Sequence, residues 1–210
     1  MEINANLVKE LRDRSGAPMM ECKAALKESE GDLERAHKIL RQRGQATAAK
    51  RAAKATSEGA VVSYIHGGGK IGVLLEVNCE TDFVARTADF TGLVKDIAMH
   101  IAASDPRFIG RDEVTEAVLT EEREIYRQQA RATGKPEPVI EKIVAGKMEK
   151  YYQEACLLEQ PFVRDPAMPV KEVIHNVIAK TGENIRVRRF TRFVLGQPEA
   201  RSAEAAPPAE

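Results

Sequence analysis

A glycine-rich segment is the first group of residues whose spacing is typical of a binding function. Residues 67–72 read Gly-Gly-Gly-Lys-Ile-Gly and match the pattern G-x-G-x-x-G. A dinucleotide-binding loop of this kind needs a strand before it and a helix after it, because the pyrophosphate lies at the helix N-terminus. Here alternating apolar residues follow, which indicates a second strand. We therefore predict a hairpin turn rather than a nucleotide-binding loop.

The histidines and cysteines show no recognised spacing for a metal site or for a nucleophile and its base. The histidines His37, His66, His100 and His175 form neither an H-E-x-x-H motif nor a pair with neighbouring cysteines. We predict no metal and no cofactor. Cys79 directly follows a predicted strand and is the best candidate nucleophile, but no evident base lies near it in sequence. Because a catalytic triad is a spatial arrangement, the sequence leaves that alternative open.

The most unusual stretch is residues 78–86, Asn-Cys-Glu-Thr-Asp-Phe-Val-Ala-Arg, where a predicted strand ends. One interpretation is local: Thr81 caps a short helix, Asp82 favours its positive end, and Phe83 staples it to the core. The other is that the segment contacts a partner, because a scarce aromatic residue follows an acid at a place where side chains commonly project outward.

Two groups of basic residues raise the question of nucleic-acid binding. Residues 41–54 contain five basic residues and no acid, and residues 186–192 combine four arginines with Phe190. The second group resembles a nucleic-acid-binding strand surface, whereas the alternatives are a solvated linker and a charged sheet edge. The 32 basic and 32 acidic residues cancel, so no global field attracts nucleic acid or an anionic membrane.

The composition of the 210-residue chain is close to that of globular proteins, with 30% charged and 43% hydrophobic residues. It argues against a wholly disordered or fibrous chain. Cys22, Cys79 and Cys156 are far apart and form no C-x-x-C pair, which favours reduced thiols. The first residues lack the features of a signal peptide, and no apolar run approaches the length of a membrane span. We expect a cytoplasmic protein.

The N-terminal region predicts a helical module. Residues 5–44 show three sets of apolar residues at helical spacing, with Asp32 as N-cap of the third helix and Gly44 as its C-cap. Residues 45–57 are poor in large apolar side chains and predict an exposed, partly helical linker. We place the docking module and linker in residues 1–55.

The rest of the chain predicts an α+β core over residues 56–196. Two strands form a hairpin and a third strand comes last, with Arg188 or Arg189 marking a bulge or an edge. An amphipathic helix covers the apolar face of the hairpin. Residues 197–210 contain no core-forming residue and predict a disordered tail. The expected strands are 61–66, 71–77 and 184–195, and the expected helices are 90–101, 120–132, 137–158 and 170–180.

Five segments of the chain form a set of recognisable motifs, namely residues 11–26, 78–86, 97–104, 159–163 and 181–185. In this order they resemble the elongation factor Ts family of bacteria and organelles. The resemblance covers nearly residues 1–196. Ser15 and Pro18 depart from the residues usual in that family, Thr and Gly, which affects only the local turn geometry.

The resemblance implies a guanine nucleotide exchange factor for elongation factor Tu, with no covalent step and hence no enzyme. It implies that the N-terminal helices form a ubiquitin-associated-like fold that docks on the nucleotide-binding domain of the GTPase. The segment around Phe83 would reach toward the Mg²⁺ and phosphate side of the nucleotide pocket. The partner-binding residues that it implies are Arg12, Met19, Met20, Thr81, Asp82, Phe83, Val84 and His100.

Further expectations concern assembly, the alternative function and His100. Longer members of the family carry two copies of the core half, so a chain with one copy is expected to form a homodimer. We expect the helical hairpin of longer members to be absent. The alternative function is a nucleic-acid-binding translation accessory protein that uses Arg186, Arg188, Arg189 and Arg192, although direct nucleic-acid binding is not expected. A lone helical histidine such as His100 is more often structural than functional.

Overall fold

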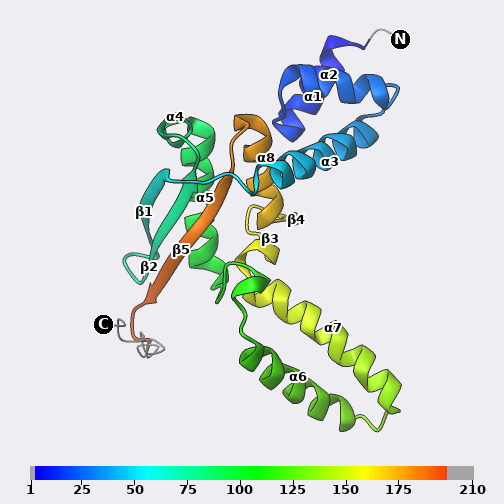
Figure 1. Cartoon of the computed structure of the whole chain (residues 1–210), viewed down its shortest axis with the longest axis vertical. Helices are drawn as coiled ribbons and strands as arrows, with labels where there is room; N and C mark the ends of the chain where they lie inside the picture. Colours follow the sequence, from blue (N-terminus) through cyan, green and yellow to red (C-terminus); the bar gives the residue numbers. More distant parts are fainter. Residues whose placement is uncertain (1–2, 198–210) are drawn as a thin grey trace.

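The computed structural model describes residues 3–197 and shows an α+β fold, which confirms the predicted fold class. In Figure 1 a central sheet with helices packed on one side carries two helical arms that extend away from it. One arm is N-terminal and the other is formed by residues from the middle of the chain. All of the predicted tail beyond position 197 lies outside the described residues.

The N-terminal arm contains α1 (Ala5–Ser15), α2 (Met19–Glu28) and α3 (Leu33–Arg51). Asp32 caps α3 as predicted, because its side chain accepts a hydrogen bond of 3.0 Å from the backbone N–H of Arg35. The three helices enclose a small core of their own, which is marginal for a unit of this size. The buried residues of this core are Val8, Leu11, Cys22, Ala25, Leu26, Ala36 and Leu40.

The predicted C-cap at Gly44 is wrong, because α3 continues through Gly44 to Arg51. A Cβ atom at Gly44 would lie 3.7 Å from the Cβ of Ala179, so this glycine is where α3 packs against a later helix. Ala48, in the predicted linker, is buried in the central core. Tertiary packing therefore extends the helix past a residue that would otherwise favour its end.

The sheet has three antiparallel strands, β1 (Glu58–His66), β2 (Ile71–Cys79) and β5 (Ile185–Val194), in the order β1-β2-β5. The hairpin turn between β1 and β2 is confirmed. Residues 67–69 are glycines with φ of +62°, +66° and +89°, a backbone region that other residues rarely adopt. Since a strand and not a helix follows this turn, the G-x-G-x-x-G spacing is not a phosphate-binding loop.

The predicted irregularity in the last strand is also confirmed. Glu76 pairs with Arg189 and the next residue, Val77, pairs with Val187, so Arg188 is the extra residue of a β-bulge. The bulge restores the alternation of inward and outward side chains that the sequence of the strand alone does not show.

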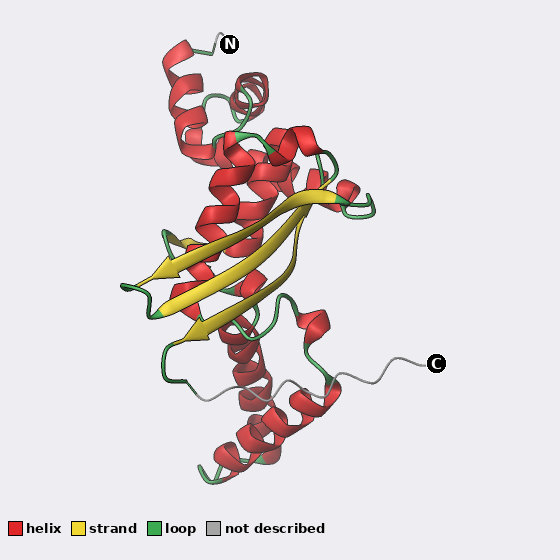
Figure 2. Cartoon of the chain, turned by 90° about the vertical axis from the view of Figure 1, so that its left-hand side faces the viewer, coloured by secondary structure: helices red, strands yellow, loops and turns green. Residues whose placement is uncertain are grey.

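The helices α5 (Ala88–Ser104) and α8 (Val170–Thr181) cover one face of the sheet. Val73, Leu75 and Val77 of β2 point toward these helices and are almost completely buried. In Figure 2 the other face of the sheet is turned to the viewer, and no helix within residues 3–197 lies over it. The exposed large apolar residues of this outer face are Val61, Ile65, Leu74 and Phe193.

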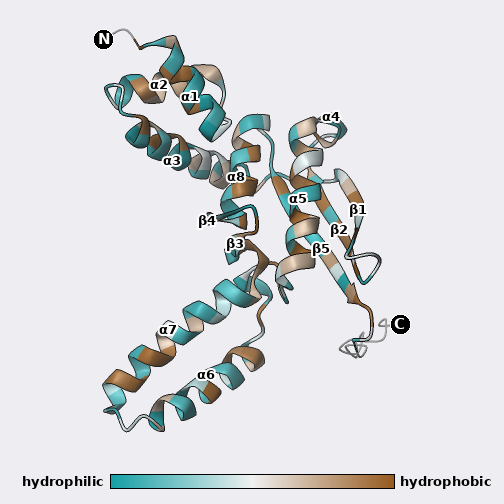
Figure 3. Ribbon diagram, turned by 180° about the vertical axis from the view of Figure 1, so that it is seen from behind, coloured by the Kyte–Doolittle hydropathy of each residue, from teal (hydrophilic) through white to brown (hydrophobic). Residues whose placement is uncertain are grey.

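The second arm is a helical hairpin of α6 (Glu116–Arg131) and α7 (Glu137–Ala155) (Figures 1 and 3). The expectation that the chain lacks a helical hairpin is therefore wrong. Both helices were predicted within a few residues of their ends, but their sequences do not reveal that they pair with each other away from the sheet. They enclose a separate apolar cluster that includes Ile140, Val144 and Met148.

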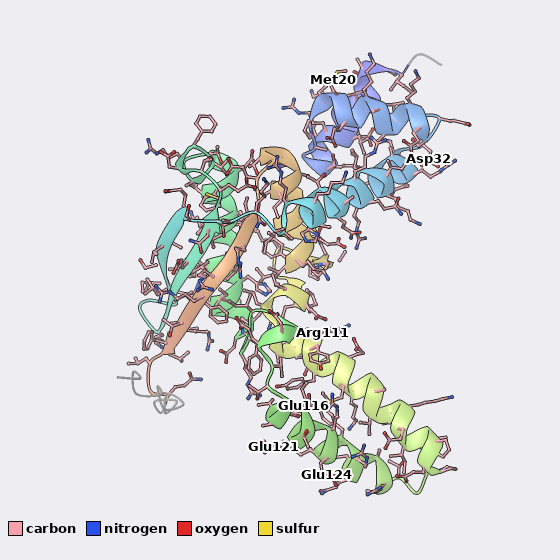
Figure 4. All side chains as sticks on the ribbon, in the orientation of Figure 1. Met20, Asp32, Arg111, Glu116, Glu121 and Glu124 are labelled. Atoms are coloured by element: carbon pink, nitrogen blue, oxygen red, sulfur yellow. The ribbon has the colours of Figure 1, made fainter. Side chains whose placement is uncertain are left out.

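Arg111, labelled in Figure 4, fixes the base of this hairpin. Its guanidinium group pairs with Glu149 of α7 at 2.7 Å and with Glu159, and it lies 4.2 Å from the centre of the Tyr152 ring. The hydrogen bonds to the carboxylates of Glu159 and Glu149 raise the pKa of the Arg111 guanidinium further above its already high usual value. The planar guanidinium group forms hydrogen bonds only in defined directions and stacks on the ring, so Arg111 fixes the direction in which α7 leaves the core as well as neutralising the two carboxylates with which it pairs.

Shorter elements complete the described chain. They are α4 (Asp82–Ala85), the 3-10 turns η1 (Arg111–Glu113) and η2 (Leu157–Glu159), and the small hairpin of β3 (Pro161–Phe162) and β4 (Asp165–Pro169). The sequence did not predict this small hairpin, whose strands are too short to show an alternating pattern. None of the described helices is long and apolar enough to cross a lipid bilayer.

Candidate partner-binding site

The segment that follows β2 turns into the short helix α4, and its first residue is held by several contacts. Thr81 caps α4 as predicted, since its side-chain oxygen accepts a hydrogen bond of 3.3 Å from the backbone N–H of Val84. Asp82 lies in the first turn and pairs with Arg86 at 2.8 Å on the exposed side of the helix. An exposed ion pair of this kind contributes little to stability.

Phe83 projects from this turn into solvent. Its side chain is 78% exposed, whereas its neighbour Val84 is 4% exposed and packs into the central core. The interpretation in which Phe83 staples the helix to the core is therefore wrong, and Val84 has that role instead. Large apolar side chains occur singly on many protein surfaces, but here a scarce aromatic ring is held outward by a buried neighbour.

Cys79 has a structural environment rather than that of a nucleophile. Its thiol is buried and donates a hydrogen bond of 3.1 Å to the backbone carbonyl of Thr81. Burial, reinforced by the charge of Glu183, raises the pKa of the Cys79 thiol, which favours the unreactive protonated form. Within residues 3–197 no group of three or more acidic, histidine or cysteine side chains could hold a metal ion.

A second exposed apolar surface lies on the N-terminal arm. Met19 and Met20 begin α2 and are 57% and 73% exposed, and Arg12 of α1 is exposed as well. Figure 4 places Met20 on the N-terminal arm, away from the helical hairpin. The exposed residues of the predicted site are thus divided between two surfaces, one formed by α1 and α2 and one at α4.

The two surfaces are joined by a packed connection and not by a loose linker. The carboxylate of Glu172 in α8 is buried and pairs with Arg41 of α3, and the side-chain amide of Gln45 donates to it at 3.2 Å. Because α3 is a single helix that packs on α8, the N-terminal arm is held against the core.

The comparisons with known proteins agree over almost the whole chain. The family model described as "Elongation factor TS" matches residues 2–197. The chain belongs to the elongation factor Ts family. Elongation factor Ts of Koribacter versatilis is 61% identical over 196 residues, which cover 93% of this chain and 90% of that protein. Elongation factor Ts of Fervidobacterium nodosum is 57% identical over 197 residues, 94% of this chain and 100% of that protein.

Membership of the elongation factor Ts family gives the protein its function, which is nucleotide exchange on elongation factor Tu during translation elongation. The alternative of a nucleic-acid-binding accessory protein is not favoured. Two of the four arginines on which it rests form ion pairs within the chain, since Arg189 pairs with Glu76 at 2.7 Å and Arg192 pairs with Asp105 at 3.0 Å.

In this elongation factor Ts chain, His100 lies in α5 and is not part of the exposed surface at α4. Its ring has no exposed area, and its Nδ1 accepts a hydrogen bond of 3.2 Å from the backbone N–H of Val163. Its Nε2 therefore carries the proton and donates to the side-chain oxygen of Gln160 at 2.8 Å, a tautomer assigned from these contacts. Burial lowers the pKa of His100, which keeps the ring neutral. In this conformation His100 and Val84 therefore expose almost no surface through which they could contact a partner directly.

Sequence reasoning missed one residue that touches the α4 segment, Glu183, which lies in the turn between α8 and β5. Its carboxylate contacts both the backbone and the side chain of Thr81. A signal was available, because residues 181–185 are one of the motifs that carry the family resemblance. The motif could not by itself reveal which residue it meets 102 positions earlier in the chain.

Proposed function

We propose that this exchange factor accelerates GDP release by inserting the Phe83 ring and the Asp82 carboxylate at the Mg²⁺ and phosphate side of the nucleotide pocket of elongation factor Tu. The observation that carries the proposal is the 78% exposure of Phe83 on a turn that is capped by Thr81 and anchored by Val84. A ring held outward before binding loses little conformational freedom when it enters a partner. No covalent step, metal or cofactor of the factor itself takes part.

The magnitudes are consistent with a wedge. Complete burial of a phenylalanine side chain contributes about 1.5–3 kcal/mol. A coupling free energy of about 1–3 kcal/mol changes the affinity of a second ligand by about 5- to 150-fold. Since Mg²⁺ requires near-octahedral coordination, a small displacement of its ligands weakens the hold on the nucleotide substantially. Because coupling is reciprocal, incoming GTP weakens the binding of the factor by the same ratio.

Asp82 is suited to act beside the ring. Its partner Arg86 is 80% exposed, and the ion pair lies entirely on the surface. Such a pair is readily exchanged for contacts to another protein, because water already screens it. The carboxylate then brings a negative charge toward the cation and phosphates, where it competes with the bound nucleotide.

The second surface supplies affinity. We propose that residues 1–55 form the docking module and that Arg12, Met19 and Met20 contact the nucleotide-binding domain of elongation factor Tu. Methionine side chains adapt to a partner surface with little strain. The packed junction of α3 and α8, with the buried carboxylate of Glu172, supports a fixed spacing between this surface and Phe83 within the core of residues 56–196.

We also propose that the protein works in the cytoplasm as a homodimer in which the outer faces of two sheets meet. The outer face exposes Leu74 at its centre and Phe193 on the neighbouring strand, opposite Gly72. Apolar faces of two antiparallel sheets pack together readily, and a two-fold interface needs a surface that is complementary to itself. The zero net charge of the chain means that association of two copies meets no repulsion between net charges.

The test of the exchange mechanism is stopped-flow measurement of the release of fluorescent GDP from elongation factor Tu. We expect the double variant Asp82→Ala with Phe83→Ala to lose most of the acceleration at a saturating concentration of factor. An acceleration equal to that of the unaltered factor would remove the wedge from the mechanism, while leaving the family assignment in place.

A further inference from the structure

The α4 segment and the turn after α8 hold each other by reciprocal hydrogen bonds. The backbone N–H of Thr81 donates to the carboxylate of Glu183 at 3.0 Å, and the Thr81 hydroxyl donates to the other oxygen of that carboxylate at 2.7 Å. In return, the backbone N–H of Asn184 donates to the carboxylate of Glu80 at 2.6 Å. Two consecutive residues on each side are therefore joined across the end of the sheet, where β2 finishes and β5 begins (Figure 1).

We propose that Glu183 is a positioning residue for nucleotide exchange, because its carboxylate orients Thr81 and thereby holds the α4 turn with Phe83 pointing outward. This inference rests on the proposed role of Phe83. Glu183 does not contact the nucleotide or elongation factor Tu in this mechanism, and it acts only through Thr81.

The orientation of one hydroxyl group explains how the effect reaches Phe83. The hydroxyl oxygen of Thr81 donates its hydrogen to Glu183, so its lone pairs remain for the backbone N–H of Val84. A helix of four residues has almost no stability of its own, because nucleation costs more than one turn of hydrogen bonds returns. The α4 turn therefore depends on its cap and on the buried side chain of Val84, and Phe83 lies between the two.

The same turn reaches the end of α3. Asn184 is buried, and its side-chain amide donates to the backbone carbonyl of Lys54 at 2.9 Å and to that of Ala52 at 3.4 Å. Arg51, the last residue of α3, lies 3.5 Å from the carboxylate of Glu80. The chain that leaves the docking module is thus bound to Glu80 and Asn184, two of the four residues that hold the turn. A displacement of the module on docking would reach Phe83 through these contacts.

The experiment compares the full-length factor with Glu183→Ala, Glu183→Gln and Phe83→Ala, alone and combined, in the stopped-flow assay. We expect Glu183→Ala to lower the maximal rate of GDP release by about tenfold, the effect of about one hydrogen bond to a charged group. The half-saturating concentration of factor should change less than twofold, because the methionine surface is unaltered. Glu183→Gln keeps one acceptor oxygen and should recover part of the rate. Glu141→Ala, which removes a carboxylate paired with Arg127 on the distant hairpin, is the matched control and should have no effect.

The double variant decides whether Glu183 acts through Phe83. In the Phe83→Ala background the Glu183→Ala change should have no further effect on the maximal rate, whereas an unchanged tenfold loss would overturn the proposal.

Hydrogen exchange of the backbone amides 81–84 in the free factor gives a readout that is independent of nucleotide exchange activity. It should become faster in Glu183→Ala, and equal protection would also overturn the proposal. If Phe83→Ala alone left GDP release unchanged, the proposed function would fail, and the amide exchange would still report whether Glu183 holds the turn.

Discussion

Phe83 and Val84 are consecutive residues of one short turn, yet 78% of the first side chain is exposed and only 4% of the second. The contrast separates two tasks within a single dipeptide. Val84 fixes the turn to the central core, and Phe83 is presented to the surroundings. A substitution at Val84 should therefore lower the stability of the fold, whereas a substitution at Phe83 should slow exchange and leave the stability almost unchanged.

Val84→Ala should lower the free energy of unfolding by about 1–3 kcal/mol, because it removes two buried methyl groups from the central cluster. Phe83→Ala should change it by less than about 0.5 kcal/mol, since the ring is in solvent. Urea unfolding followed by circular dichroism measures both values. A large loss of stability in Phe83→Ala would show that the ring is packed in solution.

Met20→Ala should weaken docking without slowing the exchange step. The side chain is 73% exposed, and its burial in a partner contributes about 1–2 kcal/mol, which corresponds to a rise of about 5- to 30-fold in the half-saturating concentration. The maximal rate of GDP release at saturation should remain. Ile125→Ala, at an exposed apolar residue of the helical hairpin, is the control and should leave both parameters unchanged. A lower maximal rate in Met20→Ala would contradict the division of roles between the two surfaces.

Acid should destabilise the fold through two histidines, the buried His100 and the partly buried His175. Burial lowers the pKa of His100 and of His175 below the usual value near 6.5. The unfolded chain therefore binds more protons than the folded chain between the two pKa values of each group. The stability that they contribute is fully present above about pH 6.5 and is lost as the pH falls from there toward the folded pKa values.

Denaturant titrations between pH 7.5 and pH 5 test this expectation. The free energy of unfolding should fall with pH over that interval in the unaltered protein, and the slope should be smaller in His100→Gln and in His175→Gln. Glutamine keeps a polar side chain at each position and does not titrate. Equal slopes in all three proteins would show that neither histidine is held neutral by the fold.

Leu74→Lys should convert the proposed homodimer into a monomer, because it places a charge at the centre of the outer sheet face. Sedimentation velocity at micromolar concentration measures the change. Ile125→Lys introduces the same charge on an exposed apolar residue of the hairpin and should leave the dimer intact. An unaltered factor that sediments as a monomer with full exchange activity would rule out the dimer.

The sequence predicts best where burial imposes a strict period. In β2, Val73, Leu75 and Val77 alternate with residues of the outer face, so both the strand and its buried side follow directly from the pattern. An irregularity at Arg188 or Arg189 is predictable for the same reason, since these residues interrupt the alternation, and the register of β5 with β2 identifies it as a bulge at Arg188. The end of α3 was not predictable at Gly44, because the helix is extended by packing on α8, a partner more than 120 residues away.

The candidate site shows the same limit. The motif around Phe83 predicts a partner-binding segment, but the exposure and burial of its adjacent residues depend on which side of the turn meets the core. Local rules favoured a stapled Phe83, and the structure buries Val84 instead. His100 lies in a family motif and on the expected helix, yet its ring turns inward to Gln160. Glu183 is positioned by the pairing of β5 with β2, which no local pattern encodes.

The most direct test of the central claim is photocrosslinking from position 83 of the factor. With p-benzoylphenylalanine in place of Phe83, we expect an efficient crosslink to nucleotide-free elongation factor Tu at residues that line the Mg²⁺ and phosphate side of its pocket, and we expect excess GDP to suppress it. The same group in place of Ile125 should give no crosslink at those residues. A crosslink from position 83 that is absent, or that maps to a surface remote from the nucleotide, would contradict the account.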